Sequence, residues 1–424
     1  MIIRPRVQRL IISRTWKAFL AITLLWTTFE VIGIRRGLTR EASKESPPFG
    51  NQRIFIASIH WTNERLLREY WVPAVAQLAE DIGREHVFVS VYESGSLDDS
   101  KGALRELDQQ LYSLGIDHKV VLDETSHLDE VEREHAEEGW VQMPTARSYR
   151  QNWTDDFTLE KSSWQPRRIP YLARSRNEAL QPLYEQESKG ILYDRILWLN
   201  DVVFATSDVQ ALLATRDGEY AAACALDFKK APAFYDTFAL RDAEGQAPLT
   251  DTWPFFRSSL SRSAMIRGEA VPVASCWNGM VAFDPAPFYR IARRLSFRGI
   301  PDSLAKLHVE GSECCLIHAD NPLSHTKGVW VNPNVRVAYN GTAYSAINAE
   351  SAWPRTSAVA TGLWRNRMLR LGRYFKATKA VGEVSERVRK WTEWGEGAAG
   401  GGEPGEYCLI DEMQFLLWNG WGHA

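Results

Sequence analysis

Residues 195–201, RILWLND, decide the fold class of this chain. The run Arg195–Leu199 has the length and the apolar composition of a buried β-strand. Two polar residues, Asn200 and Asp201, follow it directly. Ligands of open α/β sheets bind at the carboxyl ends of the strands, so this polar pair marks a candidate functional site.

Segments before this strand repeat the pattern in alternating order. Apolar strands are predicted at 53–59, 87–92 and 119–122, and amphipathic helices at 63–83 and 101–114 lie between them. This order predicts a parallel sheet with right-handed crossovers, so the fold class is α/β. Two later strands also end in acids: Tyr220–Leu226 precedes Asp227, and Cys276–Phe283 precedes Asp284.

The rest of the chain is organised around this sheet. Residues 123–154 are acidic without periodicity and are predicted to be an insertion. Residues 365–391 are basic and predicted to be helical, and 395–405 are Gly-rich and predicted to be a flexible linker. A closing helix, 407–418, is predicted within a C-terminal segment, 406–424, that packs on the domain.

Composition excludes several classes of protein. The chain has 424 residues with 45% hydrophobic and 24% charged residues, which is typical of a globular protein. Its net charge of −3 argues against a nucleic-acid binder. Five cysteines are too few for a disulfide scaffold, and their odd number leaves at least one free thiol. The absence of P-loop, GxGxxG and GxSxG motifs argues against a P-loop kinase, a dehydrogenase and an α/β-hydrolase.

The N-terminus predicts a membrane anchor. Residues 1–17 carry Arg and Lys but no acid, and the apolar run 18–34 has Glu30 as its only charge. A signal anchor fits this run, which is at the short end for a span. A presequence and a cleaved or buried segment are the alternatives. The basic flank favours a cytosolic tail at 1–17, followed by a polar stem at 35–52.

The polar residues at the strand ends suggest metal and sugar chemistry. Asn200 offers a neutral oxygen and Asp201 a charged one, which are ligands that Mn²⁺ or Mg²⁺ accepts in nucleotide-sugar transferases. A cap on the following segment is an equally good interpretation of Asp201. Asp227 can bind sugar hydroxyls or cap a turn. Asp242 is most simply part of a polar turn.

A second group of candidates lies further along the chain. Trp277, Asn278 and Gly279 combine a stacking ring, an amide and an approachable backbone, which suits a sugar, although a buried strand start explains them better. Glu313 stands in an apolar stretch, where a carboxylate is costly unless it is paired or functional. His318 is more often a core histidine than a metal ligand in such a place.

Several segments taken together resemble one known family. They include 53–64 (RIFIASIHWTNE), 195–204 (RILWLNDVVF), 234–245 (FYDTFALRDAEG), 272–284 (PVASCWNGMVAFD) and 312–320 (SECCLIHAD). In this order they resemble the fungal cryptococcal mannosyltransferase and capsule-associated protein family, glycosyltransferase family 69. The resemblance covers 53–421 and implies a GT-A-like (Rossmann-like) domain at 53–394 behind a single membrane helix.

The resemblance also implies an activity and a place in the cell. It implies transfer of mannose from GDP-mannose to a mannose-containing glycan in α-1,3 linkage, with a divalent metal, and a type II Golgi membrane protein with a luminal catalytic domain. The sequence leaves two alternatives open: a non-catalytic polysaccharide-assembly protein of the same fold, and a transferase with another nucleotide sugar.

Roles for single residues follow from the same resemblance. Asn200 and Asp201 match the metal motif without its first acid, and His318 or Asp320 would complete the metal shell. Asp227 and Glu313 are the candidate catalytic carboxylates. The remaining matches are expected to bind the nucleotide sugar through Glu93, Arg174 and Asn177, and the sugar or acceptor through Trp277, Asn278 and Gly279.

Overall fold

A nine-stranded sheet with the order β3-β2-β1-β6-β10-β7-β12-β9-β8 organises the domain. The computed structural model describes residues 5–135, 138–142, 164–290, 292–349, 353–374, 379–395 and 401–424. The sheet strands are β1 Ile54–His60, β2 Val87–Ser94, β3 Asp117–Asp123, β6 Arg195–Leu199, β7 Ala222–Phe228, β8 Arg241–Asp242, β9 Val271–Ser275, β10 Met280–Phe283 and β12 Val329–Ala338.

The sheet is mostly parallel, as its sequence pattern predicts. Strands β1, β2, β3 and β6 pair in parallel, and β12 is parallel to β7. Strand β10 lies antiparallel between β6 and β7. The carboxyl ends of β1, β2, β3, β6, β7 and β12 therefore meet at one edge, which is where polar residues follow the strands.

Helices cover both faces of the sheet because alternate strand residues are apolar on both faces. On one face, Phe55 and Trp198 pack with α6. On the other, Ile54 and Leu197 pack with α3, α4 and α7. The helices of the domain are α2 Glu64–Leu66, α3 Val72–Ile82, α4 Ser100–Leu114, α5 His127–Glu132, α6 Arg168–Ser188, α7 Thr206–Leu213, α8 Ser259–Arg267, α9 Asp302–Ala305, α10 Glu313–Asp320, α11 Gly341–Asn348, α12 Thr356–Tyr374 and α13 Lys379–Glu393, with a π-helical turn at Leu67–Trp71.

The predicted insertion at 123–154 contains α5 and the short strand β4, Trp140–Gln142, which pairs with β5, Trp164–Pro166. Residues 136–137 and 143–154 of this insertion lie outside the described residues.

The C-terminal segment contains strands, and the predicted closing helix at 407–418 is wrong. A short 3₁₀ turn, Glu406–Cys408, leads into β13, Leu409–Ile410, which pairs with β11, Glu310–Gly311. Strands β14, Gln414–Leu417, and β15, Gly420–His423, then form a hairpin. The apolar spacing of this segment fits a helix, but its contacts with β11 and α6 override that local preference.

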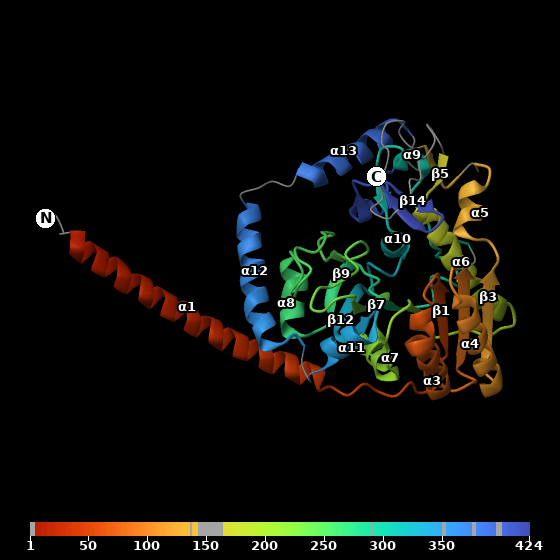
Figure 1. Ribbon diagram of the computed structural model, residues 1–424, viewed down its shortest axis with the longest axis horizontal. Coiled ribbons are helices and arrows are strands. Elements are labelled where there is room, and N and C mark those ends of the chain that lie inside the picture. Colours follow the sequence, from red (N-terminus) through yellow and green to blue (C-terminus); the bar gives the residue numbers. More distant parts are fainter. Residues whose placement is uncertain are drawn as a thin grey trace.

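The N-terminal helix α1, Pro5–Ala42, is longer than the predicted span and includes residues 35–42 of the predicted stem. Its segment Thr15–Ala42 is long and apolar enough to cross a membrane. Figure 1 shows α1 leaving the domain, with only its C-terminal part beside α8 and α12. Val31 and Leu38 are buried there. Residues 35–42 are therefore packed helix, and a polar connector begins only after Ala42.

Two disulfides join distant parts of the domain, Cys224–Cys276 and Cys315–Cys408. The second ties the C-terminal segment to α10. Cys314 is the remaining thiol and is buried, which agrees with the odd cysteine count.

We expect the purified, non-reduced protein to show one reactive thiol after denaturation, because four of its five cysteines are paired. Titration with a thiol reagent in denaturant, with and without prior reduction, measures this directly. Reduced protein is the control and should show five. Five thiols without reduction would contradict the pairing.

Candidate functional site

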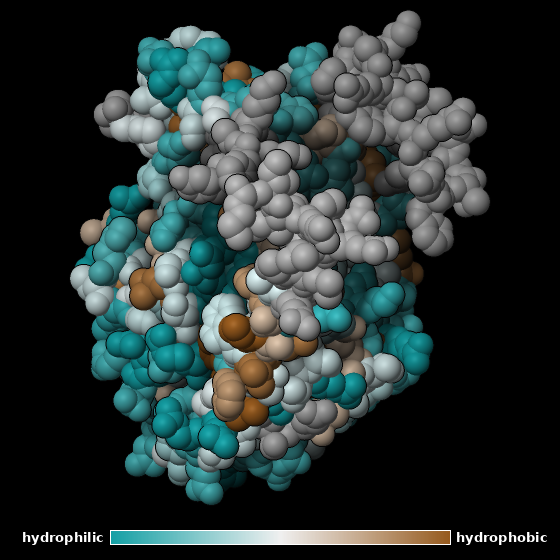
Figure 2. Space-filling model, turned by 90° about the vertical axis from the view of Figure 1, so that its left-hand side faces the viewer, coloured by the Kyte–Doolittle hydropathy of each residue, from teal (hydrophilic) through white to brown (hydrophobic). Residues whose placement is uncertain are grey.

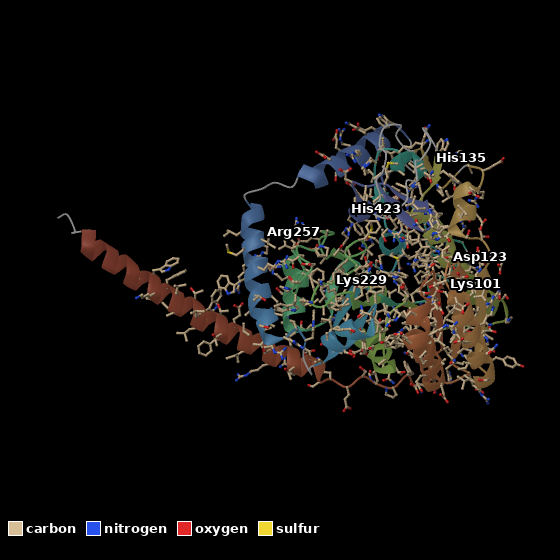
Figure 3. The ribbon with its side chains drawn as sticks, viewed as in Figure 1. Lys101, Asp123, His135, Lys229, Arg257 and His423 are labelled. Atoms are coloured by element: carbon tan, nitrogen blue, oxygen red, sulfur yellow. A yellow bond between two sulfur atoms is a disulfide. The ribbon has the colours of Figure 1, made fainter. Side chains whose placement is uncertain are left out.

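A cavity of about 730 Å³ opens at the carboxyl edge of the sheet. The ends of four strands contribute to its wall: Asn63 after β1, Asp201 after β6, Lys229 after β7 and Tyr339 after β12. Figure 3 shows Lys229 among the side chains in the middle of the domain. The crossovers thus bring together residues that are far apart in the sequence.

Asp201 is the carboxylate on this cavity that the sequence predicted. Its side chain accepts a hydrogen bond from Asn63, and the surrounding protein raises its pKa to about 6 because burial disfavours the charge. Lys229 and Arg176 act on it only at a distance. Within the described part of the chain, Asp201 has no ion-pair partner. A shielded carboxylate without a contacting cation on an open cavity fits a divalent metal, which in such sites is often held by one or two carboxylates and substrate phosphates.

Asn200 holds Asp201 in position. Its side-chain oxygen accepts a hydrogen bond from the indole nitrogen of Trp277 at 2.9 Å, and its backbone amide donates to the carbonyl of Gly279 at 2.9 Å. Its own carbonyl accepts from the indole of Trp71 at 3.0 Å. One lone pair of the amide oxygen remains, so a metal contact from Asn200 stays a prediction.

Asp227 forms a buried acid pair with Asp236. One oxygen of Asp227 accepts from the amide of Asp236 at 3.1 Å, and the other accepts from the hydroxyl of Tyr339 at 2.9 Å. Burial and the neighbouring Asp236 raise the pKa of Asp227 to about 7. The sequence interpretation missed Asp236, although it lies in the segment FYDTFALRDAEG that carries the family resemblance.

Gly279 and Asn278 bring this acid pair against β10. Both have positive φ, 79° and 59°, which glycine and asparagine adopt most readily. A Cβ on Gly279 would lie 2.9 Å from Val202 and 3.2 Å from the Cβ of Asp227. The side-chain amide of Asn278 donates a hydrogen bond to the backbone carbonyl of Asp236 at 3.3 Å. These two residues shape the site, and their contact with a sugar stays a prediction.

Trp277 is a core residue, and the predicted sugar platform is wrong for it. Its side chain is 2% exposed and packs against Trp198, Phe283 and Phe297. The guanidinium of Arg176 covers it at 4.3 Å from the ring centroid. No ring face is left for a sugar.

Glu313 lies in a buried ion pair with Arg176. Oε1 of Glu313 accepts from Nε of Arg176 at 3.0 Å, and both side chains are almost fully buried. Glu313 begins α10, where the exposed backbone amides favour a negative charge. Sequence reasoning selected Arg174 and Asn177 and missed Arg176, which lies between them in the sequence.

Arg174 and Asn177 point elsewhere. Arg174 pairs with Glu130 at 2.8 Å and lines a second cavity of about 620 Å³. Asn177 uses both groups of its amide on the backbone of Phe297, at 2.8 and 3.0 Å. Asn177 is thus tied to the backbone of Phe297, and its nucleotide contact stays a prediction.

Glu93 lies at the carboxyl end of β2, where the resemblance places it. The side chain is fully buried and accepts a hydrogen bond from the amide of Ser96, with Lys101 3.9 Å away. Burial raises its pKa. Figure 3 shows Lys101 beside Asp123, which ends the neighbouring strand β3. Charged groups thus continue along the same edge.

His318 is a core histidine, and the predicted metal ligand is wrong. Its Nε2 donates to the carbonyl of Cys276 at 2.6 Å, and its ring stacks on Phe283. Cys224 and Cys276 come close to it, but their sulfurs are bonded to each other and cannot ligate as thiolates. The alternative ligand, Asp320, forms an ion pair with Arg298 at 2.6 Å.

The buried His318 should make stability fall in acid. Burial lowers its pKa from 6.5 to about 4, so the unfolded chain takes up the proton first as the pH falls. Its contribution is complete above pH 6.5 and is lost toward pH 4. At about 1.4 kcal/mol per pKa unit, this amounts to about 3 kcal/mol. We expect His318→Gln to unfold in urea with a smaller loss of stability between pH 7 and 4.5 than the wild type. Identical losses would contradict this assignment.

The C-terminal hairpin closes one side of the site through Arg168, which was also missed. Nη1 of Arg168 donates to Gln414 at 2.8 Å, and its guanidinium lies 4.6 Å from the ring centroid of Trp421. The pKa of Arg168 is lowered because the side chain is buried, and the nearby charges of Glu313 and Asp236 oppose this shift. Trp421 in turn contacts Trp61 after β1. A buried cation thus lies near enough to Glu313 and Asp236 to interact with their charges.

The chain is distantly similar to several solved structures. No curated protein matches the chain. Among solved structures it is similar to the mannosyltransferase PcManGT from Pyrobaculum calidifontis in complex with GDP-Man and Mn²⁺, with 14% identity, a TM-score of 0.36, and coverage of 86% of this chain and 77% of that chain. It is also similar to S. aureus TarS 1-349 in complex with UDP-GlcNAc, with 11% identity, a TM-score of 0.37, and coverage of 80% and 81%.

A match to a protein-family model shows the family to which the chain belongs. The model described as Cryptococcal mannosyltransferase 1 matches residues 53–320, which is well over half of the 424 residues. The matched part runs from β1 to the end of α10 and includes Asp201, Asp227, Asp236 and Glu313. The chain therefore belongs to the Cryptococcal mannosyltransferase 1 family and is a glycosyltransferase built on a mostly parallel α/β sheet.

Proposed function

We propose that this protein is a metal-dependent α-1,3-mannosyltransferase that transfers mannose from GDP-mannose to a mannose-containing glycan in fungal capsule or cell-wall synthesis. The observation that carries the proposal is the position of Asp201 on the cavity at the carboxyl edge of the sheet, with the acid pair Asp227–Asp236 and the pair Arg176–Glu313 behind it. The choice of mannose as the transferred sugar is supported by membership of the Cryptococcal mannosyltransferase 1 family.

A divalent ion, Mn²⁺ or Mg²⁺, would be held by Asp201, with Asn200 as a candidate second ligand. Such an ion neutralises charge on the diphosphate leaving group. The protein also has positively charged side chains near the proposed metal site. Lys229 lines the cavity, and Arg168 at the start of α6 interacts with the charges of Glu313 and Asp236. Their role is to bind and orient the phosphates of the donor.

The acids differ in what they can do. Asp227 is held by Asp236 and Tyr339, and Glu313 is held by Arg176. Neither lines the cavity of about 730 Å³. An α-linked product from an α-linked donor requires retention of configuration. We propose that the acceptor attacks from the face that the diphosphate leaves, which needs no nucleophilic carboxylate from the protein.

The compartment follows from the helix and the cysteines. Helix α1 would anchor the protein with its N-terminus in the cytosol, as a single-pass type II protein. Four of the five cysteines are in disulfides, and these persist in oxidising compartments. This supports a catalytic domain in the lumen of the secretory pathway, and we propose the Golgi membrane.

The function is tested with the full chain in detergent, because residues 31 and 38 of α1 are buried in the domain. The protein would receive GDP-mannose or one of several UDP-sugars, Mn²⁺ and an α-mannobiose acceptor. We expect transfer of mannose from GDP-mannose only, with loss on chelation. Transfer from a UDP-sugar would overturn the donor, and no transfer from any donor would favour an assembly role.

A further inference from the structure

Helix α12 has two halves with different surroundings. In its first half, Val359 and Leu363 are buried in the core of the domain. Its last turns expose large apolar side chains: Met368 is 62% exposed, Leu369 38% and Leu371 57%. An exposed apolar end on a well-packed helix marks an interaction surface.

The exposed end continues the face of α12 that contacts α1. Trp364, Met368 and Leu371 are spaced i, i+4 and i+7 and share one helix face. The indole nitrogen of Trp364 donates to Thr27 of α1 at 3.2 Å, and its ring meets Trp26 edge-on at 6.2 Å. Helix α1 therefore covers this face at position 364 and leaves it uncovered from position 368.

The length of the apolar run in α1 indicates which of its residues lie within the bilayer. At a rise of about 1.5 Å per residue, the apolar run 18–34 spans about 26 Å, which is less than the hydrocarbon core of about 30 Å. A helix that crosses the bilayer with this run needs all of it within the membrane. Trp26 and Thr27 lie inside the run, so Trp364, which contacts both, lies at the membrane as well.

The only charge in the run has its partner on α12. Glu30 forms an ion pair with Arg367. The guanidinium of Arg367 also lies over Trp26 and Trp364, 4.7 and 5.1 Å from their ring centroids. A carboxylate near lipid is costly unless it is paired. Helix α12 therefore supplies the group that lets the last turns of the span enter an apolar layer.

We propose that residues 364–371 of α12 are a membrane-contacting surface that enters the bilayer beside α1. Met368, Leu369 and Leu371 contact the acyl chains, and the exposed Arg370 reaches the headgroups. The inference rests on the membrane anchoring proposed above. Figure 1 shows α12 on the side of the domain from which α1 departs, and Figure 2 shows hydrophobic side chains gathered toward the middle of that side.

The test places an environment-sensitive fluorophore on single introduced cysteines of the full-length protein in phosphatidylcholine–phosphatidylserine vesicles. Leu371→Cys reports on α12. Ile22→Cys reports on the span, and Leu128→Cys on α5 is the aqueous control, since both side chains are exposed. Wild-type protein measures background labelling of the buried Cys314.

We expect position 371 to behave like position 22, with blue-shifted emission that is quenched by a lipid-bound nitroxide and protected from iodide. Position 128 should show the reverse. Quenching of position 371 by iodide, with position 22 still protected, would overturn the proposal for α12 and leave the anchor intact. Iodide quenching at both positions would overturn the anchor and the proposal together.

Discussion

Asp201→Asn should reduce mannose transfer by roughly 100- to 1,000-fold while the protein stays folded, because losing one preorganised electrostatic group typically has an effect of this size. Asp201 is the carboxylate after β6 that lines the cavity, and the surrounding protein already raises its pKa. The asparagine removes the free-energy cost of burying a charge at this position, and it keeps the size and the hydrogen-bonding ability of the side chain. Initial rates at saturating GDP-mannose, together with thermal unfolding, measure both effects.

The matched control is Asp284→Asn. Asp284 follows the antiparallel strand β10 and therefore lies at the opposite edge of the sheet, where it pairs with Lys327. The same chemical change there should leave the rate close to that of the wild type. Equal losses in both variants, or a normal rate in Asp201→Asn, would contradict the assignment of Asp201 to the site.

Arg176→Met should destabilise the protein by about 3–5 kcal/mol, because it leaves Glu313 buried without a partner. Removing both charges is different. A buried ion pair replaced by apolar groups is often neutral in stability. We therefore expect Arg176→Met with Glu313→Leu to recover most of the lost stability, and the double variant to remain inactive. Denaturant unfolding of the four proteins of the cycle gives the coupling energy.

Arg294→Met is the matched control for this cycle. Arg294 pairs with Glu187 at 2.7 Å, but its side chain is 39% exposed, and exposed pairs contribute at most about 1 kcal/mol. Additive losses in the double variant would show that Arg176 and Glu313 do not act as a pair. Full activity in the stable double variant would remove both residues from the site.

The parallel sheet was predictable because its signals are local. Each buried strand is a short apolar run, and the helices between 63 and 114 have clear amphipathic spacing. The C-terminal hairpin was not predictable in this way. Its apolar residues satisfy a helical pattern, and only contacts with β11, α6 and Cys315 select strands. The length of α1 was underestimated for a related reason, since residues 35–42 look polar and gain their order from contact with α8 and α12.

Some of the candidate residues carry a local signal in the sequence. Asp201 and Asp227 follow apolar strands, and Glu313 stands in an apolar stretch. Asp236 and Arg176 were missed because they lie in a loop and inside a helix, and only the fold brings them to the strand ends. Trp277 and His318 are core residues, which is the interpretation that their sequence surroundings favoured, and the family resemblance had selected them for the site.

The central claim is that the acids at the carboxyl edge form a metal-dependent site for a nucleotide sugar. Calorimetric titration of the full-length protein with GDP-mannose tests it most directly, in the presence of Mn²⁺, in the presence of chelator, and with Asp201→Asn. The account predicts binding by the wild type with Mn²⁺, and much weaker binding after chelation or in the variant. Equally tight binding under all three conditions, or none under any of them, would contradict it.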